Sequence, residues 1–319
     1  MADTDSHVAG APIAGPPVAG PPGSGPRSTG TAVTDPPVRG PLAAAWRRFA
    51  ANRAALVGLV VFVLLVLAAF VGRRLWRWDY RDLTGAYSEP PSLQHPFGTN
   101  ESGYDMLARV LKGTARSIEI ALFVAVVSTA LGTVIGAVAG YTRGLTDGFL
   151  MRVVDLVLIL PLYAIAALLG HQVSGKSGGW FGLAVVLSLL LWAPIARVVR
   201  GVTLGLREQE FLDAARALGA TDRQILLRHV LPNASGTIIV NATVCVAIAV
   251  LAETALSYVG FGIQAPDVSL GLLVANAEAA SSTRSWLFYY PGLVLIVLVL
   301  TVNLIGDGLS DAFDPRSAR

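Results

Sequence analysis

The sequence predicts an all-α polytopic membrane protein with six membrane-spanning helices. Its composition is the first reason: the 319 residues are 54% hydrophobic and only 14% charged, whereas soluble domains carry about 25% charged residues. A water-soluble fold would leave much of that apolar surface exposed, while lipid solvates it directly. The second reason is run length, because six apolar stretches approach the roughly 20 residues that a helix needs to cross the hydrocarbon core.

The six expected spans are about Ala54–Val71, Ile118–Gly140, Leu150–Gly170, Phe181–Ala196, Gly236–Gly262 and Leu287–Ile305. Pro161 interrupts the third stretch, and Pro194 should kink the fourth near its end. A packed bundle tolerates both prolines because neighbouring groups re-satisfy the freed carbonyls. One of the six stretches could instead be a re-entrant segment.

Residues 1–45 are expected to form a disordered, Pro/Gly-rich cytoplasmic tail, followed by a transmembrane domain over residues 46–319. The tail has proline doublets and no apolar periodicity, so it cannot bury enough surface to offset the entropy of ordering. It does not read as a signal peptide, because the first apolar run comes late and is too long.

The arginine distribution predicts the orientation. In a six-span arrangement both termini lie on one side, and that side holds more Arg and Lys residues than the other. We therefore expect both termini to be cytoplasmic. The main external segment would be about residues 72–117, and the main cytoplasmic loop about residues 197–235.

The chain carries no recognisable catalytic or cofactor chemistry. It has no Gly-x-x-x-x-Gly-Lys-Ser/Thr loop, so it does not bind ATP by that route. Its four histidines lack metal-ligand spacing, and the single Cys245 allows no intrachain disulfide. The arginines sit between apolar runs, as membrane topology requires, and do not suggest a nucleic-acid partner. We therefore expect no catalytic residue, no metal and no bound cofactor.

The loop between the fourth and fifth spans predicts two short helices. Residues 206–218 are strong helix formers, and Gly219 can adopt the left-handed conformation that ends a helix. Thr221 and Gln224 have capping-box spacing, which restarts a helix that Pro232 should stop. Ala214 and Ala215 give the first helix a small-residue face that another protein could approach closely. A hairpin that merely links two spans would have the same shape.

This loop resembles the Glu-Ala-Ala loop of importer-type ABC permeases, in which Glu-Ala-Ala precedes a glycine and a later Leu-Pro. The matching positions are Asp213, Ala214, Ala215, Gly219, Leu231 and Pro232. Asp213 replaces the usual Glu, and His229 stands where many members have Ile. The resemblance implies that the loop docks into a cleft on a cytoplasmic ATPase and transmits the ATP cycle to the membrane helices.

Four further segments resemble the C-type subunits of dipeptide, oligopeptide and nickel permeases: residues 46–59, 95–105, 256–262 and 306–316. In the second of these, Asn100 and Tyr104 replace the commoner Asp and Arg. The resemblance covers essentially everything after the tail, and it implies a type I ABC importer permease fold.

The resemblance also implies partners. These are a homologous second permease subunit, two ABC ATPase subunits or domains that hold ATP and Mg, and an extracytoplasmic solute-binding protein. The chain itself would be a non-catalytic permease for dipeptides or oligopeptides, surrounded by membrane lipid. Nickel or another small solute is the alternative cargo. A secondary transporter or a membrane scaffold is the alternative class, although the inverted repeats of secondary transporters are not visible.

Two features within the spans remain. Glu253 and Asn241 are costly in a bilayer, so they face the bundle interior or water, where they would either line a translocation path or form interhelical hydrogen bonds. Gly132, Gly136 and Gly140 recur every four residues, which permits close helix packing. The neighbouring helix could belong to this chain or to a partner permease.

Overall fold

The computed structural model describes residues 41–174 and 179–313. Within them the regular elements are helices, and strand-like pairing is limited to two isolated bridges, Leu83 with Tyr104 and Thr99 with Asp105. The helices are α1 (Pro41–Ala51), α2 (Arg53–Leu67), α3 (Arg73–Leu75), α4 (Met106–Thr142), α5 (Gly144–Ile159), α6 (Leu162–Ser174), α7 (Gly179–Arg207), α8 (Glu210–Ala217), α9 (Asp222–Ile225), α10 (Leu231–Tyr258), α11 (Leu270–Ala277) and α12 (Ser285–Phe313). Two π-helical turns, Ala68–Gly72 and Leu226–Val230, join α2 to α3 and α9 to α10, and a 3₁₀ turn, Glu278–Ala280, follows α11.

The predicted all-α membrane fold is confirmed. Among the described residues, five continuous helical stretches are long and apolar enough to cross a membrane: Arg53–Leu75, Met106–Thr142, Gly179–Arg207, Asp222–Tyr258 and Ser285–Phe313. They correspond to the first, second, fourth, fifth and sixth predicted spans. The third prediction corresponds to α5 and α6 together, which are apolar enough as a pair but bend by 80°.

The bend between α5 and α6 has a local cause. Leu160 has extended backbone angles, with φ −66° and ψ 131°, as expected for a residue that precedes a proline. Pro161 also has no N–H to continue the helix. The pair is therefore either one broken span, which gives six spans, or a re-entrant loop, which gives five.

Several helices extend beyond the predicted spans. Asp105 caps α4 by accepting a hydrogen bond from the Ala108 backbone N–H at 2.8 Å, so the helix begins well before Ile118. The later part of the predicted external segment is consequently the start of α4. Similarly, α7 continues through Pro194 to Arg207.

The N-terminal boundary also moves. The predicted tail lies outside the described residues as far as residue 40, but α1 begins at Pro41, inside the predicted tail of residues 1–45. Proline is favoured in the first turn of a helix, where its missing N–H costs nothing, and the alanines that follow are strong helix formers.

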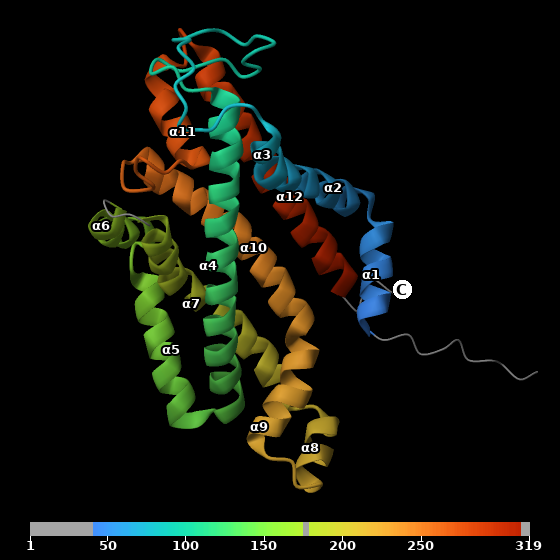
Figure 1. The fold of residues 1–319 in the computed structure, drawn as a ribbon. Coiled ribbons are helices and arrows are strands. Elements are labelled where there is room, and N and C mark those ends of the chain that lie inside the picture. Colours follow the sequence, from blue (N-terminus) through green and yellow to red (C-terminus); the bar gives the residue numbers. More distant parts are fainter. Residues whose placement is uncertain (1–40, 175–178, 314–319) are drawn as a thin grey trace, which may run out of the picture. The chain divides into compact units, whose positions relative to one another are not determined.

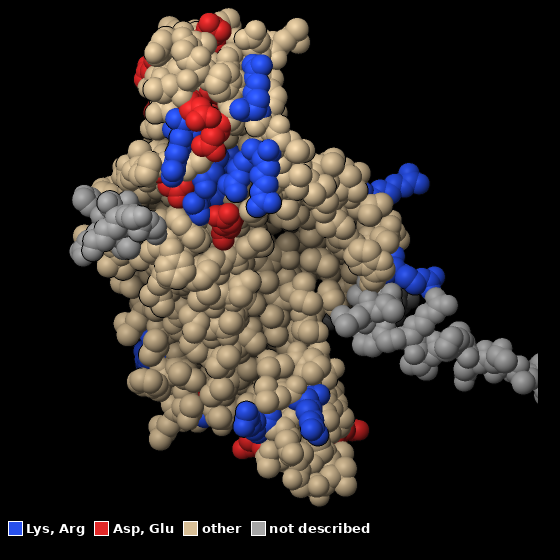
Figure 2. Space-filling model, viewed as in Figure 1, with Lys and Arg blue, Asp and Glu red and all other residues tan. Residues whose placement is uncertain are grey.

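Helix α4 is central to the bundle (Figure 1). It packs against α7 on one side and against α10 on another, while α2 packs along α12. The loop of residues 76–105 lies at one end of α4, and the hairpin of α8 and α9 lies at the opposite end (Figure 1). On the face shown in Figure 2, charged side chains gather at these two ends, with a largely uncharged band between them. A bilayer requires this distribution.

The loop of residues 76–105 is held by a buried carboxylate. Asp105 is fully buried and accepts hydrogen bonds from the Trp76 indole at 3.1 Å, and its other oxygen lies 2.7 Å from His95 Nδ1. Trp78 stacks on the His95 ring. The segment from His95 to Asp105, which carried part of the family resemblance, is therefore the scaffold of this loop.

Candidate functional site

The α8–α9 hairpin turns at Gly219. This residue has φ +83°, which a residue without a side chain adopts readily. The Gly219 N–H donates to the Arg216 carbonyl at 2.9 Å, and the Ala220 N–H donates to the Ala215 carbonyl at 3.1 Å. Together these two bonds form a Schellman motif, which satisfies carbonyls that the end of α8 leaves unpaired. The predicted helix-ending role of Gly219 is confirmed.

The predicted capping box is also confirmed. The Gln224 backbone N–H donates to the Thr221 hydroxyl at 3.4 Å, and the Thr221 backbone N–H donates to the Gln224 side-chain oxygen at 2.9 Å. The first predicted helix, however, is wrong in its start. Gln209 is extended, with φ −84° and ψ 137°, so α7 ends at Arg207 and α8 is a separate helix. This break turns α8 so that Leu212 points into a buried cluster.

The prediction that Pro232 stops the second helix is wrong. Helix α9, the π-helical turn and α10 form one continuous helical stretch, Asp222–Tyr258, with Pro232 in the first turn of α10. Proline in a regular helix clashes with the carbonyl four residues earlier. Here the preceding turn is π-helical, with the Leu231 N–H donating to the Leu226 carbonyl, and this wider turn accommodates the ring.

The hairpin is fastened to the transmembrane bundle through Tyr141, in the last turn of α4. Its hydroxyl donates to Asp222 Oδ1 at 2.6 Å. Its ring is buried with Leu212 and Ile225, and the guanidinium of Arg216 lies 5.7 Å from the ring centroid. Hydrogen bonding with the Tyr141 side chain raises the pKa of Arg216 above its ordinary value. Sequence reasoning missed Tyr141 because nothing in the sequence near it points to the hairpin.

The hairpin presents an exposed apolar face. Phe211, Ala214 and Leu218 are all exposed and are spaced three and four residues apart, so they share one side of α8. Leu218 is 89% exposed. Ala215 is half-buried, so the small face that another protein can reach belongs to Ala214. Asp213 is exposed and pairs with Arg216 at 2.6 Å.

The six positions of the Glu-Ala-Ala pattern are divided between the hairpin and the start of α10. Asp213, Ala214 and Ala215 lie on α8, and Gly219 forms the turn. Leu231 and Pro232 lie at the start of α10, where Leu231 is half-buried and Pro232 is exposed. The motif thus runs from α8, through the Gly219 turn, to the first turn of α10.

Glu253 joins three helices. It lies on α10 and is 1% exposed. One of its carboxylate oxygens accepts hydrogen bonds from the hydroxyls of Ser257 at 2.7 Å and Ser269 at 2.6 Å, and the other accepts from Ser117 of α4 at 3.4 Å. Ser269 is also the N-cap of α11. Of the two roles considered for Glu253, this geometry is that of an interhelical hydrogen-bonded group.

Asn241 lies on the same helix but is remote from Glu253. The two residues are separated by about 18 Å along the axis at 1.5 Å per residue. The Asn241 side-chain amide donates to the Thr237 carbonyl of its own helix at 2.9 Å. The structure therefore does not bring the two candidate path residues together.

The glycine stripe of α4 packs against α7 of the same chain. A Cβ at Gly132 would lie 2.8 Å from the Trp192 carbonyl oxygen, one at Gly136 would meet the Ala196 carbonyl, and one at Gly140 would lie 2.8 Å from the Arg200 carbonyl. The contacted carbonyls are also four residues apart, so the two helices meet backbone to backbone over about two turns.

A charged cluster near the start of α4 was not expected from the sequence. Arg116 donates to Glu119 at 2.6 Å and to Asp267 at 3.2 Å, and it lies 4.6 Å from the centre of the Trp180 ring. It therefore ties α4 to the segment before α11 and to the start of α7. Within the described residues, no group of three or more His, Cys, Asp or Glu side chains could hold a metal ion.

Comparison with known proteins gives matches over nearly the whole chain. Residues 132–319 match the family described as binding-protein-dependent transport system inner membrane component, and residues 40–96 match the N-terminal transmembrane domain of oligopeptide transport permease C. The oligopeptide transport system permease proteins OppC of Mycobacterium tuberculosis and Mycobacterium bovis are each 42% identical to this chain over 272 residues, covering 85% of this chain and 93% of theirs. A Brucella suis protein whose name refers to a peptide permease is 38% identical over 289 residues, covering 88% of this chain and 93% of its own.

Proposed function

We infer the function from one premise: the chain belongs to the family of binding-protein-dependent transport system inner membrane components. We propose that it is the permease subunit of an ATP-driven importer whose cargo is dipeptides and oligopeptides. The cargo assignment is supported by the relatives named as oligopeptide permeases, which match 85% of the chain. It is also supported by the match of residues 40–96 to an oligopeptide permease domain.

The observation that carries the ATP-driven part of this proposal is the α8–α9 hairpin. Its apolar face of Phe211, Ala214 and Leu218 is exposed, although burying such side chains would be favourable. We propose that this face docks into a cleft of a cytoplasmic ABC ATPase. Two such subunits or domains would hold ATP and Mg, while this chain binds no cofactor and catalyses nothing.

The contacts of the hairpin supply a route for transmitting motion. A displacement of α8 is passed to α4 through the buried cluster around Tyr141 and its bond to Asp222. Helix α4 moves together with α7, because their backbones are in direct contact along the glycine stripe. Asp147 of α5 joins the same body through two bonds from Arg200 of α7, at 2.6 and 2.7 Å. An ATPase that pulls on α8 would thus move several spans at once, as alternating access requires.

The remaining partners follow from the same proposal. A homologous second permease would complete the membrane-spanning unit within the lipid, and an extracytoplasmic solute-binding protein would deliver the cargo. With the hairpin in the cytoplasm, the loop of residues 76–105 would face outward, at the opposite end of α4 (Figure 1). Both termini would be cytoplasmic, with α5 and α6 together forming one broken span.

The docking role can be tested with Leu218→Glu. Leu218 is 89% exposed, so the substitution leaves the folded chain intact but places a charge on the proposed interface. Burial of a leucine stabilises a contact by about 1.5–3 kcal/mol. Co-purification of the ATPase subunits with the permease should therefore weaken roughly 10- to 100-fold, while the amount of permease in the membrane stays unchanged.

Leu93→Glu is the matched control. Leu93 is also highly exposed, at 102%, but lies in the loop at the opposite end of α4, so its substitution should leave ATPase association unchanged. If Leu218→Glu retains the ATPases as well as the wild-type protein does, the α8 face is not the docking surface.

A further inference from the structure

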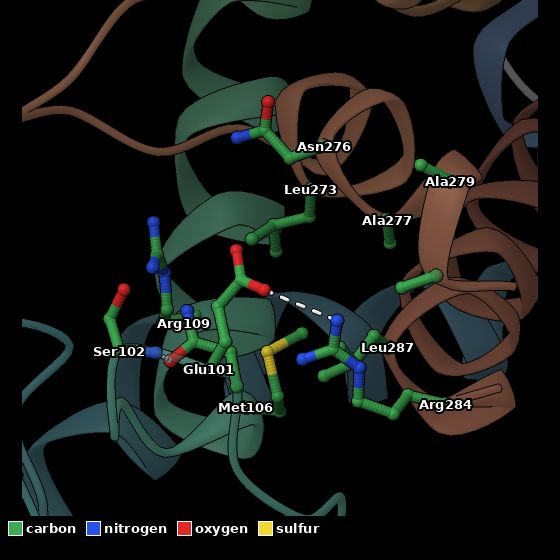
Figure 3. Close-up of a pocket in the computed structure, with 12 residues that line it drawn as sticks. Glu101, Ser102, Met106, Arg109, Leu273, Asn276, Ala277, Ala279, Arg284 and Leu287 are labelled. Carbon is green, nitrogen blue, oxygen red and sulfur yellow. Dashed lines mark hydrogen bonds and ion pairs between the residues drawn. The ribbon is translucent and has the colours of Figure 1, made fainter. Parts of the chain in front are cut away.

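A cavity (Figure 3) is lined by the start of α4, which is the end opposite the hairpin (Figure 1). Its volume is about 430 Å³, within the range of about 300–1,000 Å³ that is typical of small-molecule sites. Three elements line it: the loop before α4, the start of α4, and the segment from α11 to the start of α12. Met106, Leu273 and Leu287 contribute apolar surface to the wall.

The two arginines that line this cavity differ in their hydrogen bonding. Arg284 donates to Ser88 at 3.0 Å and to Glu101 at 3.2 Å, so its guanidinium is occupied (Figure 3). Arg109 also lines the cavity, but its Nε is buried without a hydrogen-bond partner among the described residues. Its guanidinium lies 5.0 Å from the centroid of the Tyr104 ring, in a cation–π contact.

An arginine that is partly removed from water and has no acceptor is costly to the protein. A carboxylate is the natural complement of a guanidinium, because two parallel N–H···O bonds can form between the two groups. The side-chain amides of Asn100 and Asn276 also line the cavity and can donate further hydrogen bonds. Among Arg109, Arg284 and Glu101, two charges are positive and one is negative, so the cavity favours an anion.

The chemistry of a general peptide importer narrows the choice of anion. Peptides of different sequence share only their backbone and their two charged ends, so a site that accepts all of them must read one of these constant features. The apolar wall of the cavity would not select for a particular side chain of the peptide. A role for this cavity in cargo binding rests on the proposed peptide function and on an outward-facing position of this end of α4.

We propose that this cavity is an outer binding site for short peptides, in which Arg109 binds the C-terminal carboxylate of the cargo. Arg109 is a specificity residue that recognises a free peptide end. Glu101 competes with the cargo, since it holds Arg284 in an ion pair and adds negative charge to the same cavity.

The test measures ATP-dependent uptake by the complete reconstituted importer, binding protein included. Two probes are compared: trialanine with a free C-terminus and the same tripeptide as its C-terminal amide. The ratio of the two uptake rates at sub-saturating concentration is the readout. Any preference of the binding protein contributes equally to every permease variant, so the change in ratio isolates the permease.

Arg109→Gln should lower the free-to-amide ratio roughly 10- to 100-fold, because a hydrogen-bonded charge is lost for the free peptide only. Glu101→Gln should raise the ratio several-fold, because it frees Arg284 and removes a repelling charge. Arg81→Gln is the matched control. Arg81 also lies 5.0 Å from a tyrosine ring centroid, that of Tyr80, but does not line the cavity, so its ratio should equal that of the wild-type protein.

The proposed site would be overturned if Arg109→Gln left the free-to-amide ratio unchanged, or if it lowered the uptake of both probes equally. It would also be overturned if Arg81→Gln lowered the ratio as much as Arg109→Gln does. If Arg109→Gln does not assemble, the Glu101→Gln ratio decides: a rise supports the site, and no change overturns it. If the wild-type importer takes up both probes but neither variant changes the ratio, the binding site is overturned and the peptide-import function still stands. A wild-type complex that takes up neither probe overturns the peptide function and the site with it.

Discussion

At the scale of single residues, the backbone contact between α4 and α7 depends on glycines in α4, which have no side chain to separate the two helices. The Cβ of any residue other than glycine at position 136 would overlap the Ala196 carbonyl and approach the Arg200 nitrogen to 3.0 Å. These neighbours are backbone atoms of a buried helix and cannot move independently. The four-residue spacing of glycines predicted close packing, but the sequence could not show that the partner is α7 of the same chain.

Gly136→Ala should therefore destabilise the protein, although alanine is the better helix former. Overpacking costs typically about 1–3 kcal/mol, which exceeds the gain of about 1 kcal/mol in helix propensity. The midpoint of thermal unfolding in detergent should fall by several degrees. Gly292→Ala is the control, because Gly292 lies within α12 with open space around its Cβ position. That control should be neutral or slightly stabilising, and an equal effect of both changes would contradict the packing argument.

Glu253 shows where residue-level sequence reasoning stops. An acidic residue in an apolar span is expected to face a polar partner or water, and this expectation can be drawn from the sequence. Its three serine partners lie on α4, on α10 and at the start of α11, as far away in sequence as Ser117. Only the fold brings them together, so the choice between a path residue and a helix junction could not be made beforehand.

At the scale of elements, the hairpin was predicted in most of its local features because local chemistry determines them. The Gly219 turn and the capping box of Thr221 and Gln224 involve contacts between residues that are close in sequence. The extended Gln209 and the helical passage through Pro232 were not predicted. The first accompanies the burial of Leu212 against α4, and the second depends on a π-helical turn, for which no sequence signal was recognised.

Gly219→Val should uncouple this element without unfolding the bundle. Gly219 has open space around its Cβ position, so the cost arises from φ +83° alone, and a β-branched residue in that conformation is strained by about 1–3 kcal/mol. Relief of the strain would tilt α8 relative to α9. The reconstituted variant should bind nucleotide on its ATPases but lose most ATP-dependent uptake.

Gly219→Asn provides the comparison, since asparagine tolerates the left-handed conformation better than other non-glycine residues. It should keep most of the uptake. If the valine and asparagine variants transport equally well, the shape of the turn is not what couples the ATPase to the permease.

At the scale of the whole molecule, composition and run length were sufficient to predict a helical membrane bundle. Burial in lipid imposes the same two requirements on every such chain, namely long apolar runs and internally satisfied backbones. The tie from Tyr141 to Asp222 and the cavity around Arg109 were not predictable in this way. Each joins residues that are distant in sequence, through surfaces that only the packed bundle creates.

The central claim is that this chain is the membrane part of an importer driven by ATP from the hairpin side. The most direct measurement is uptake of a labelled tripeptide into vesicles that contain the purified complex, with the binding protein outside and ATP enclosed inside. Uptake should require both ATP and the binding protein, should persist when ion gradients are abolished, and should fall sharply in Leu218→Glu. Uptake driven by an ion gradient without ATP, or ATP-dependent uptake that is unchanged in Leu218→Glu, would contradict the central claim.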